Sequence, residues 1–205
     1  MSFQESYQQG ARRLASRSMS GLARTRVTPN QLSAAGVTLC AVGAVLVLFE
    51  NRNELLFFWL GAAVFVLGSI LDILDGALAR TSGRGTPFGA FLDSTIDRVG
   101  EALMLGSVTL VLARDDDLLG VGFTVAAIVG SMLVPYARAR AEALGLKGDV
   151  GFGSRAERVV AITAALVLAP WGVLPWAMGV LALAAWLTVA QRVVSVRAQL
   201  RAREQ

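Results

Sequence analysis

Long uncharged apolar stretches constrain the fold of this chain more than any other feature. Four of them cover residues 32–49, 55–71, 118–137 and 159–191. A helix needs about 20 mostly apolar residues to cross a bilayer. The last stretch is too long for one crossing, and the Pro- and Gly-containing segment 170–175 inside it is typical of a tight turn between two helices. The chain therefore reads as a helical membrane protein.

A further apolar segment, 88–113, contains Asp93 and Asp97 and brings the number of expected spans to six. A mean hydropathy of +0.58 and a hydrophobic content of 55% agree with this interpretation and exceed what soluble domains usually show. We expect an all-α integral membrane protein with six transmembrane helices, near residues 31–49, 54–81, 88–113, 118–144, 154–169 and 175–199.

Basic residues predict the orientation. If six spans alternate, all but two of the 19 Lys and Arg fall on one side, the exceptions being Arg52 and Arg114. Positive charge is retained in the cytoplasm, so we expect a multi-pass protein of the cell (inner) membrane with both termini cytoplasmic. The pI of about 10.2 is then a topology signal and does not indicate nucleic-acid binding, because no aromatic-studded basic patch accompanies it.

The chain divides into a short basic segment, residues 1–26, and a single membrane domain, residues 27–205. The first segment holds five arginines against Glu5 and lacks the long apolar core of a signal peptide. It favours an amphipathic helix on the anionic membrane surface, with a basic tail as the alternative. Its apolar positions are Phe3, Tyr7, Leu14 and Leu22.

Histidine is absent and Cys40 is the single cysteine. The first fact excludes histidine bases and histidine-ligated metals, and the second excludes an intramolecular disulfide. Acid–base chemistry at neutral pH therefore falls to other side chains, among which the aspartates of the apolar segments are the leading candidates.

Four aspartates, Asp72, Asp75, Asp93 and Asp97, interrupt apolar sequence, where ionised groups are costly and usually functional. Spacings of three and four residues place each pair on one helix face. A hairpin through the Gly-rich segment 81–87 would bring the two faces together. Too few bases are nearby to neutralise four acids, so the pattern predicts a site for Mg²⁺ or Mn²⁺, and two ions would suit displacement at phosphorus.

Two neighbours of the first pair favour a phosphate ligand. Gly76 has no Cβ and lets a ligand approach the backbone closely, and Arg80 is placed to bind phosphate or to pair with an aspartate. Taken singly, each residue also has an ordinary explanation, helix packing for Gly76 and membrane anchoring for Arg80, but for the whole set with both spacings kept, coincidence is implausible.

The string DILDGALARTSGRGTPFGAFLDSTID resembles, without a mismatch, the signature of the CDP-alcohol phosphotransferases. The resemblance implies that a CDP-linked donor is cleaved, CMP leaves, and an acceptor hydroxyl takes the phosphoryl-lipid unit. It also implies a homodimer. The four aspartates become ligands of a two-metal centre, and Asp97 becomes the base that accepts the hydroxyl proton. The positions that match donor contacts are Pro29, Asn30, Gln31, Leu32, Gly76, Arg80 and Thr86.

The acceptor is less constrained by the residues themselves. An anionic acceptor and ordinary positive-inside bias explain the inner-loop arginines equally well. The strings YARARAEALGLKGDVGF and SRAERVV, however, resemble actinobacterial phosphatidylinositol phosphate synthases. This implies transfer of a phosphatidyl group from CDP-diacylglycerol to inositol 1-phosphate, with acceptor-phosphate contacts from Ser131, Arg138, Arg155 and Arg192.

Two alternatives remain open at this point. One is phosphatidylglycerophosphate synthase, or another enzyme of the family with a different acceptor. The more remote one is a cation transporter, since intramembrane acids suit ion translocation. Against a transporter, the four aspartates lie toward one side and no inverted repeat is visible.

Overall fold

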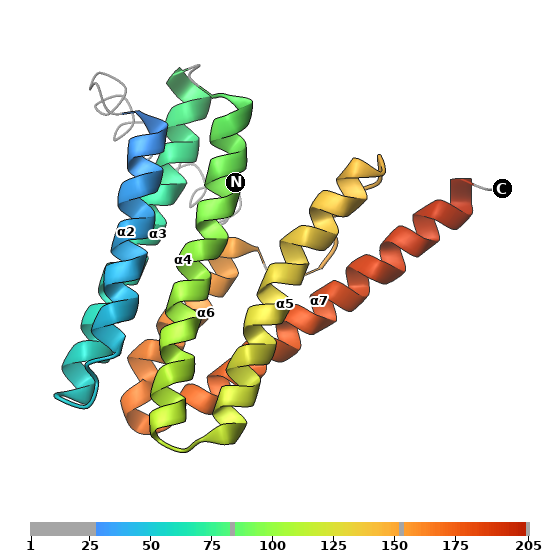
Figure 1. The fold of residues 1–205 in the computed structure, drawn as a ribbon. Coiled ribbons are helices and arrows are strands. Elements are labelled where there is room, and N and C mark those ends of the chain that lie inside the picture. The colour runs from blue at the N-terminus through green and yellow to red at the C-terminus, as the bar shows by residue number, and fades with distance from the viewer. Residues whose placement is uncertain (1–27, 83–84, 152–153, 204–205) are drawn as a thin grey trace, which may run out of the picture.

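The computed structural model describes residues 28–82, 85–151 and 154–203 of the chain, and helices are its only regular elements there (Figure 1). The expected all-α fold is confirmed, and the helix bounds differ from the predicted ones by a few residues. The segment 1–26, predicted as a surface helix, lies outside the described residues. In order, the elements are α2 (Pro29–Val47), α3 (Glu54–Ser82), α4 (Pro87–Arg114), α5 (Leu118–Ala143), α6 (Arg155–Leu168), the 3₁₀ helix η1 (Ala169–Trp171) and α7 (Leu174–Arg203).

Four of these helices, α2, α3, α5 and α7, are long and apolar enough to cross a membrane. Helix α6 has 14 residues and is about 21 Å long at 1.5 Å per residue, which is shorter than a bilayer core. Helix α4 has 28 residues, but its acids and Arg98 lower its hydropathy. The multi-pass membrane fold therefore stands, and the count of six spans stays a prediction.

Threonine side chains cap the N-termini of α2 and α4. Thr28 and Gln31 form a capping box, in which the Thr28 hydroxyl accepts from the Gln31 N–H at 3.3 Å and the Gln31 side chain accepts from the Thr28 N–H at 3.0 Å. Pro29 occupies the first turn, where its missing N–H is harmless. At the start of α4, Thr86 accepts from the Gly89 N–H at 2.9 Å.

Glycines let α2 and α3 pack backbone against backbone. A Cβ added at Gly68 would lie 2.7 Å from the Gly36 carbonyl oxygen, and one added at Gly43 would lie 2.9 Å from the Gly61 carbonyl oxygen. Only residues without a Cβ allow this approach, as in other membrane helix pairs. The contact places Asp72 of α3 against α2, because a Cβ at Gly36 would lie 3.5 Å from the Asp72 Cβ.

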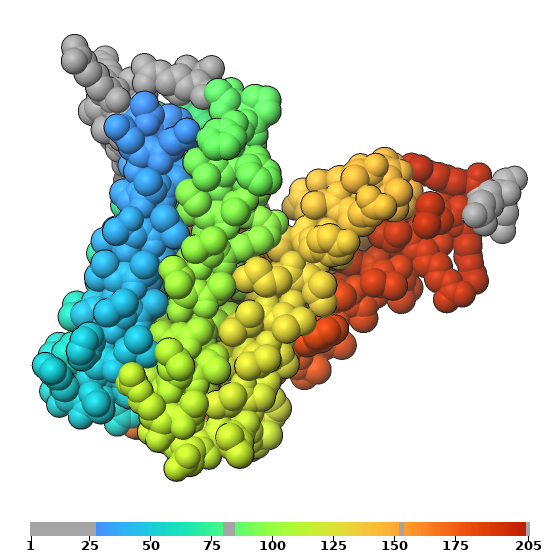
Figure 2. Space-filling model, viewed as in Figure 1, coloured from blue at the N-terminus to red at the C-terminus, as the bar shows by residue number. Residues whose placement is uncertain are grey.

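Apolar side chains from several helices form one buried core, with Phe65, Met104, Ile162 and Met178 among its largest members. Large apolar side chains also cover much of the outside, as expected for a surface that contacts lipid. The C-terminal halves of α5 and α7 project away from the body formed by α2, α3 and α4 (Figure 2).

Candidate metal centre

Three aspartates meet where α3 and α4 face each other. Asp72, Asp75 and Asp93 each offer a carboxylate oxygen, and these three oxygens lie within 4.8 Å of one another. Asp72 and Asp75 are buried, with 4% and 2% of their surface exposed. Oxygens that bind one Mg²⁺ at about 2.1 Å can be at most about 4.2 Å apart, so an inward shift of a few tenths of an ångström would complete such a site.

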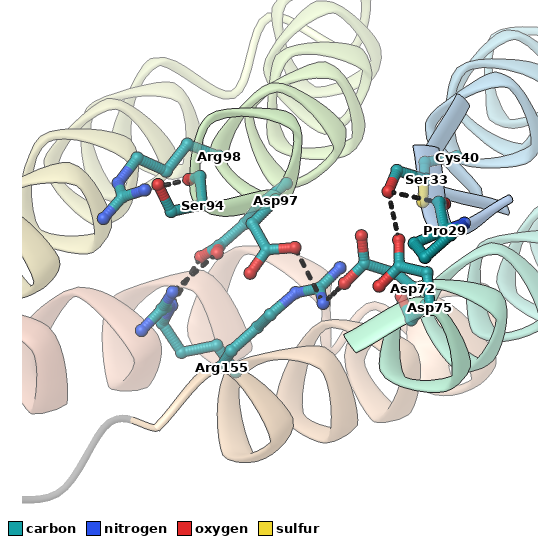
Figure 3. A network of polar contacts seen from close by, with 12 residues as sticks. Pro29, Ser33, Cys40, Asp72, Asp75, Ser94, Asp97, Arg98 and Arg155 are labelled. Atoms are coloured by element: carbon teal, nitrogen blue, oxygen red, sulfur yellow. Dashed lines mark hydrogen bonds and ion pairs between the residues drawn. The ribbon is translucent and has the colours of Figure 1, made fainter. Parts of the chain in front are cut away.

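The hydrogen bonds around these carboxylates leave ligand atoms available. Ser33 of α2 donates to Oδ2 of Asp75 (Figure 3). The Oδ1 atoms of Asp72 and Asp75 are buried and accept no hydrogen bond from any residue that the structure describes. Buried carboxylate oxygens without donors are costly, and a divalent cation would compensate them. The donor set of hard oxygens therefore fits Mg²⁺ or Mn²⁺.

Asp97 lies apart from this trio and contacts Arg155 instead. The Arg155 Nη1 atom is 2.8 Å from Asp97 Oδ1 and also forms an ion pair with Oδ2 of Asp72 (Figure 3). The guanidinium thus lies between two of the predicted metal ligands and balances part of their charge. The prediction of one four-aspartate cluster is met by three residues, while the fourth faces the N-terminus of α6.

A second ion pair joins α6 to α4, one helical turn further from the N-terminus of α6. Arg158 of α6 donates to Glu101 of α4 through Nε at 2.7 Å and Nη2 at 2.9 Å. Both residues are buried. This bidentate geometry is the strong form of an Arg–carboxylate contact, and it ties α6 to α4 below the aspartates.

A cavity of about 210 Å³ opens beside the trio. Its walls come from the N-terminus of α2, the C-terminal half of α3 and the first turns of α4. Four of the predicted donor contacts line it, namely Pro29, Asn30, Gly76 and Thr86, together with Asp75 and Asp93. A Cβ at Gly89 would lie 3.1 Å from the Thr86 hydroxyl oxygen and 3.6 Å from Asn30 Oδ1, so glycine keeps this part of the cavity open.

The remaining predicted donor contacts have other positions. Gln31 is exposed and caps α2, and Leu32 is buried in the protein. Neither of these two lines the cavity. Arg80 belongs to the last turns of α3, and its side chain lies outside the described part of the structure.

The four predicted acceptor contacts differ in their partners. Arg155 is at the aspartates, whereas Arg138 is exposed and pairs with Glu142 at 2.8 Å. Arg192 is buried and donates to the carbonyl oxygens of Val134 and Val150, the latter at 3.1 Å. Ser131 is buried, and its hydroxyl has no hydrogen-bond partner among the described residues.

Sequence reasoning missed two residues of the site. Ser33 follows Pro29 by four residues on α2, and this spacing shows that it shares a face with a predicted donor contact. Glu101 follows Asp97 by four residues, so the same periodicity could have identified it. Their partners, Asp75 and Arg158, come from other helices, which no local spacing reveals.

The chain is similar to known proteins over most of its length. A family model described as CDP-alcohol phosphatidyltransferase matches residues 26–196. Phosphatidylinositol phosphate synthase of Mycolicibacterium smegmatis is 41% identical over 182 residues, which cover 85% of this chain and 79% of that protein. The enzyme of the same name from Mycobacteroides abscessus is 37% identical over 193 residues, covering 87% and 81%.

Solved structures are similar as well. The crystal structure of Mycobacterium tuberculosis phosphatidylinositol phosphate synthase with CDP-DAG bound superposes with a TM-score of 0.79 at 32% identity, covering 90% of this chain and 94% of that one. A second structure of that enzyme, in complex with manganese and citrate, gives a TM-score of 0.76 at 34% identity, covering 89% and 88%.

Proposed function

The chain belongs to the CDP-alcohol phosphatidyltransferase family, and from this premise we propose that it makes phosphatidylinositol phosphate. The reaction transfers a phosphatidyl group from CDP-diacylglycerol to inositol 1-phosphate and releases CMP. The observation that carries this proposal is the trio Asp72, Asp75 and Asp93 beside an open cavity. The names of the relatives support the donor and the acceptor.

The cavity beside the trio is the place for the CDP part of the donor. Gly76 and Gly89 have no side chains to fill the cavity, and Asn30 and Thr86 offer polar side chains to the nucleotide. Arg80, near the end of α3, would add a positive charge for the diphosphate. The exposed apolar residues around this end would contact the acyl chains.

The acidic residues hold the metal. Asp72, Asp75 and Asp93 would provide ligands for Mg²⁺ or Mn²⁺, and together with Asp97 they would hold two ions. Bound ions of this kind neutralise the diphosphate and stabilise the leaving CMP. The hydrogen bond from Ser33 to Oδ2 holds the Asp75 carboxylate in place, so Oδ1 of Asp75 stays available to a metal.

Asp97 is suited to accept the proton of the attacking hydroxyl. The side chain is partly exposed, at 24%, so a bound substrate could reach it. The acceptor oxygen forms a bond to the phosphatidyl phosphorus while the bond from that phosphorus to the CMP oxygen breaks. The hydroxyl proton passes to the Asp97 carboxylate, and the electron pair leaves with CMP.

Arg155 is the residue best placed to hold the acceptor phosphate. Its side chain is 25% exposed and already lies beside Asp97, so a phosphate on it would bring the inositol hydroxyl near the base. Arg138, Arg192 and Ser131 would complete the pocket, and Arg138 would exchange Glu142 for the phosphate.

The proposal also covers the location and the membrane orientation of the enzyme. The distribution of Lys and Arg favours the cell membrane with both termini and the site facing the cytoplasm. Water-soluble inositol 1-phosphate would then reach the site directly. We also propose that the enzyme is a homodimer, as the family resemblance implies.

A product assay tests the function. Purified protein is given CDP-diacylglycerol, Mg²⁺ and one acceptor at a time, and lipid products and CMP are measured. Inositol 1-phosphate should support turnover at least tenfold better than free inositol or glycerol 3-phosphate. Preference for glycerol 3-phosphate would instead identify a phosphatidylglycerophosphate synthase, and absence of CMP release with every acceptor would refute the transferase proposal.

A further inference from the structure

A groove separate from the metal centre lies between the C-terminal ends of α5 and α7. We propose that this groove binds an anionic phospholipid of the surrounding membrane. It has a volume of about 550 Å³, and its walls include Tyr136 and Leu144 of α5 and Val193, Val196 and Leu200 of α7. Arg192, a proposed acceptor contact, also lines the groove, but lipid binding here does not require that role.

The groove exists because the segment after α5 holds the two helix ends apart. The helices pack closely lower down, where a Cβ at Gly130 would lie 2.7 Å from the Ala185 Cβ. Beyond that point Gln199 of α7 bonds the backbone of Lys147 twice, accepting from its N–H and donating to its carbonyl oxygen, both at 2.9 Å. Arg203 donates to the Gly145 carbonyl oxygen at 2.5 Å.

The segment covers only one side of the gap. Arg197 and Arg201 precede Gln199 and Arg203 by two residues each, which is a rotation of about 200° on an α-helix. Arg197 and Arg201 are therefore on nearly the opposite face of α7 from the two residues bound to the segment, and Val196 and Leu200 of the groove wall lie between these faces. One side of the gap is closed by protein and the other remains open to the membrane. Both helix ends project from the body of the molecule (Figure 2).

Charge selects the ligand. Arg140, Arg197 and Arg201 line the groove and are exposed, and no lining residue is acidic. Within the described chain, none of these three forms an ion pair. Such a groove suits a phospholipid, because an acyl chain would contact its apolar walls and the phosphate would contact the guanidinium groups. The C-terminal ends of α5 and α7 lie toward the same end of the molecule as the starts of α2 and α4 (Figure 1), which line the cavity beside the aspartate trio, so these arginines would meet lipid head groups.

A second copy of the chain is a poorer occupant. A symmetric dimer through this face would bring the same arginines of both copies together, and the repulsion would go uncompensated because the face has no acids. A membrane lipid satisfies the charge and fills the apolar walls at the same time.

The test separates the groove from general surface charge. Protein reconstituted in vesicles of phosphatidylcholine and phosphatidylglycerol, with EDTA and without CDP-lipid, is extracted gently, and retained lipids are counted by native mass spectrometry. Val196→Trp fills the groove and keeps every arginine. Val194→Trp is the matched control, because Val194 is exposed on the same helix and does not line the groove.

The expected result is selective retention of phosphatidylglycerol by the wild type and by Val194→Trp. Val196→Trp should lose at least fivefold in retention, and Arg197→Gln with Arg201→Gln should lose more, because each arginine near an anionic head group is worth roughly fivefold in affinity. Circular dichroism confirms that the variants fold. Equal retention by Val196→Trp and Val194→Trp would overturn the proposal, as would a change in oligomeric state without a change in bound lipid.

Discussion

Arg158 and Glu101 form a buried bidentate ion pair, with distances of 2.7 Å from Nε to Oε1 and 2.9 Å from Nη2 to Oε2. Glu101 follows Asp97 by four residues on α4, and Arg158 follows Arg155 by three residues on α6. The two Arg–carboxylate pairs therefore lie one helical turn apart between the same helices. The deeper pair fixes the rotation of α6 and so sets where Arg155 meets the aspartates.

Breaking the deeper pair should destabilise the protein strongly. Glu101→Leu removes the carboxylate that compensates the buried Arg158 charge, at a cost of about 3–5 kcal/mol. Thermal unfolding in detergent measures the loss. The double variant Glu101→Leu/Arg158→Leu should recover most of it, because the uncompensated Arg158 charge is removed as well. Equal destabilisation by the single and double variants would mean that the pair itself contributes the stability.

An exposed pair provides the matched control for that experiment. Arg138 and Glu142 are about half exposed and lie 2.8 Å apart on α5. Glu142→Gln should change stability by less than about 1 kcal/mol. A loss as large as that of Glu101→Leu would show that burial is not the cause.

The close packing of α2 against α3 predicts a second large effect. A methyl group at Gly68 would lie 2.7 Å from the Gly36 carbonyl oxygen and 2.8 Å from Cys40 Sγ, and the backbone atom cannot move aside cheaply. Gly68→Ala should therefore cost about 1–3 kcal/mol. Gly106→Ala is the control, because no atom outside its own helix lies within 4 Å of the added Cβ. This change should be neutral or stabilising, and similar melting temperatures for both variants would contradict the packing account.

The sequence pattern predicted features within single helices, but it did not predict contacts between helices. The lengths of the apolar stretches predicted the helices, and the spacing of three residues predicted the face shared by Asp72 and Asp75 (Figure 3). The rotation of α6 against α3 and α4 is a tertiary property, so the separation of Asp97 from the trio was not predictable. The contact of Ser33 with Asp75 also joins two helices and needed the structure.

Asp97 should be essential for turnover and dispensable for donor binding. It lies outside the trio and contacts Arg155, so Asp97→Asn removes the proton acceptor without removing the three clustered oxygens. Loss of a general base lowers rates by about 10²–10⁴-fold. CMP release measures turnover, and equilibrium binding of CDP-diacylglycerol measures the donor. A parallel loss of donor affinity would make Asp97 a metal ligand only.

Arg155 should affect the acceptor more than the donor. Arg155→Ala removes the guanidinium beside Asp97 and is expected to raise the KM for inositol 1-phosphate at least tenfold while the KM for CDP-diacylglycerol changes less than threefold. Lys147→Ala, an exposed change in the segment after α5, is the control. An unchanged acceptor KM would remove Arg155 from the acceptor pocket.

The central claim is that Asp72, Asp75 and Asp93 hold a divalent cation, and anomalous scattering from crystals grown with Mn²⁺ tests it most directly. The account predicts an anomalous peak among these three carboxylates, and a much weaker peak in Asp75→Asn crystals. Well-diffracting crystals with Mn²⁺ and CDP-diacylglycerol present, but without a peak at this position, would contradict it.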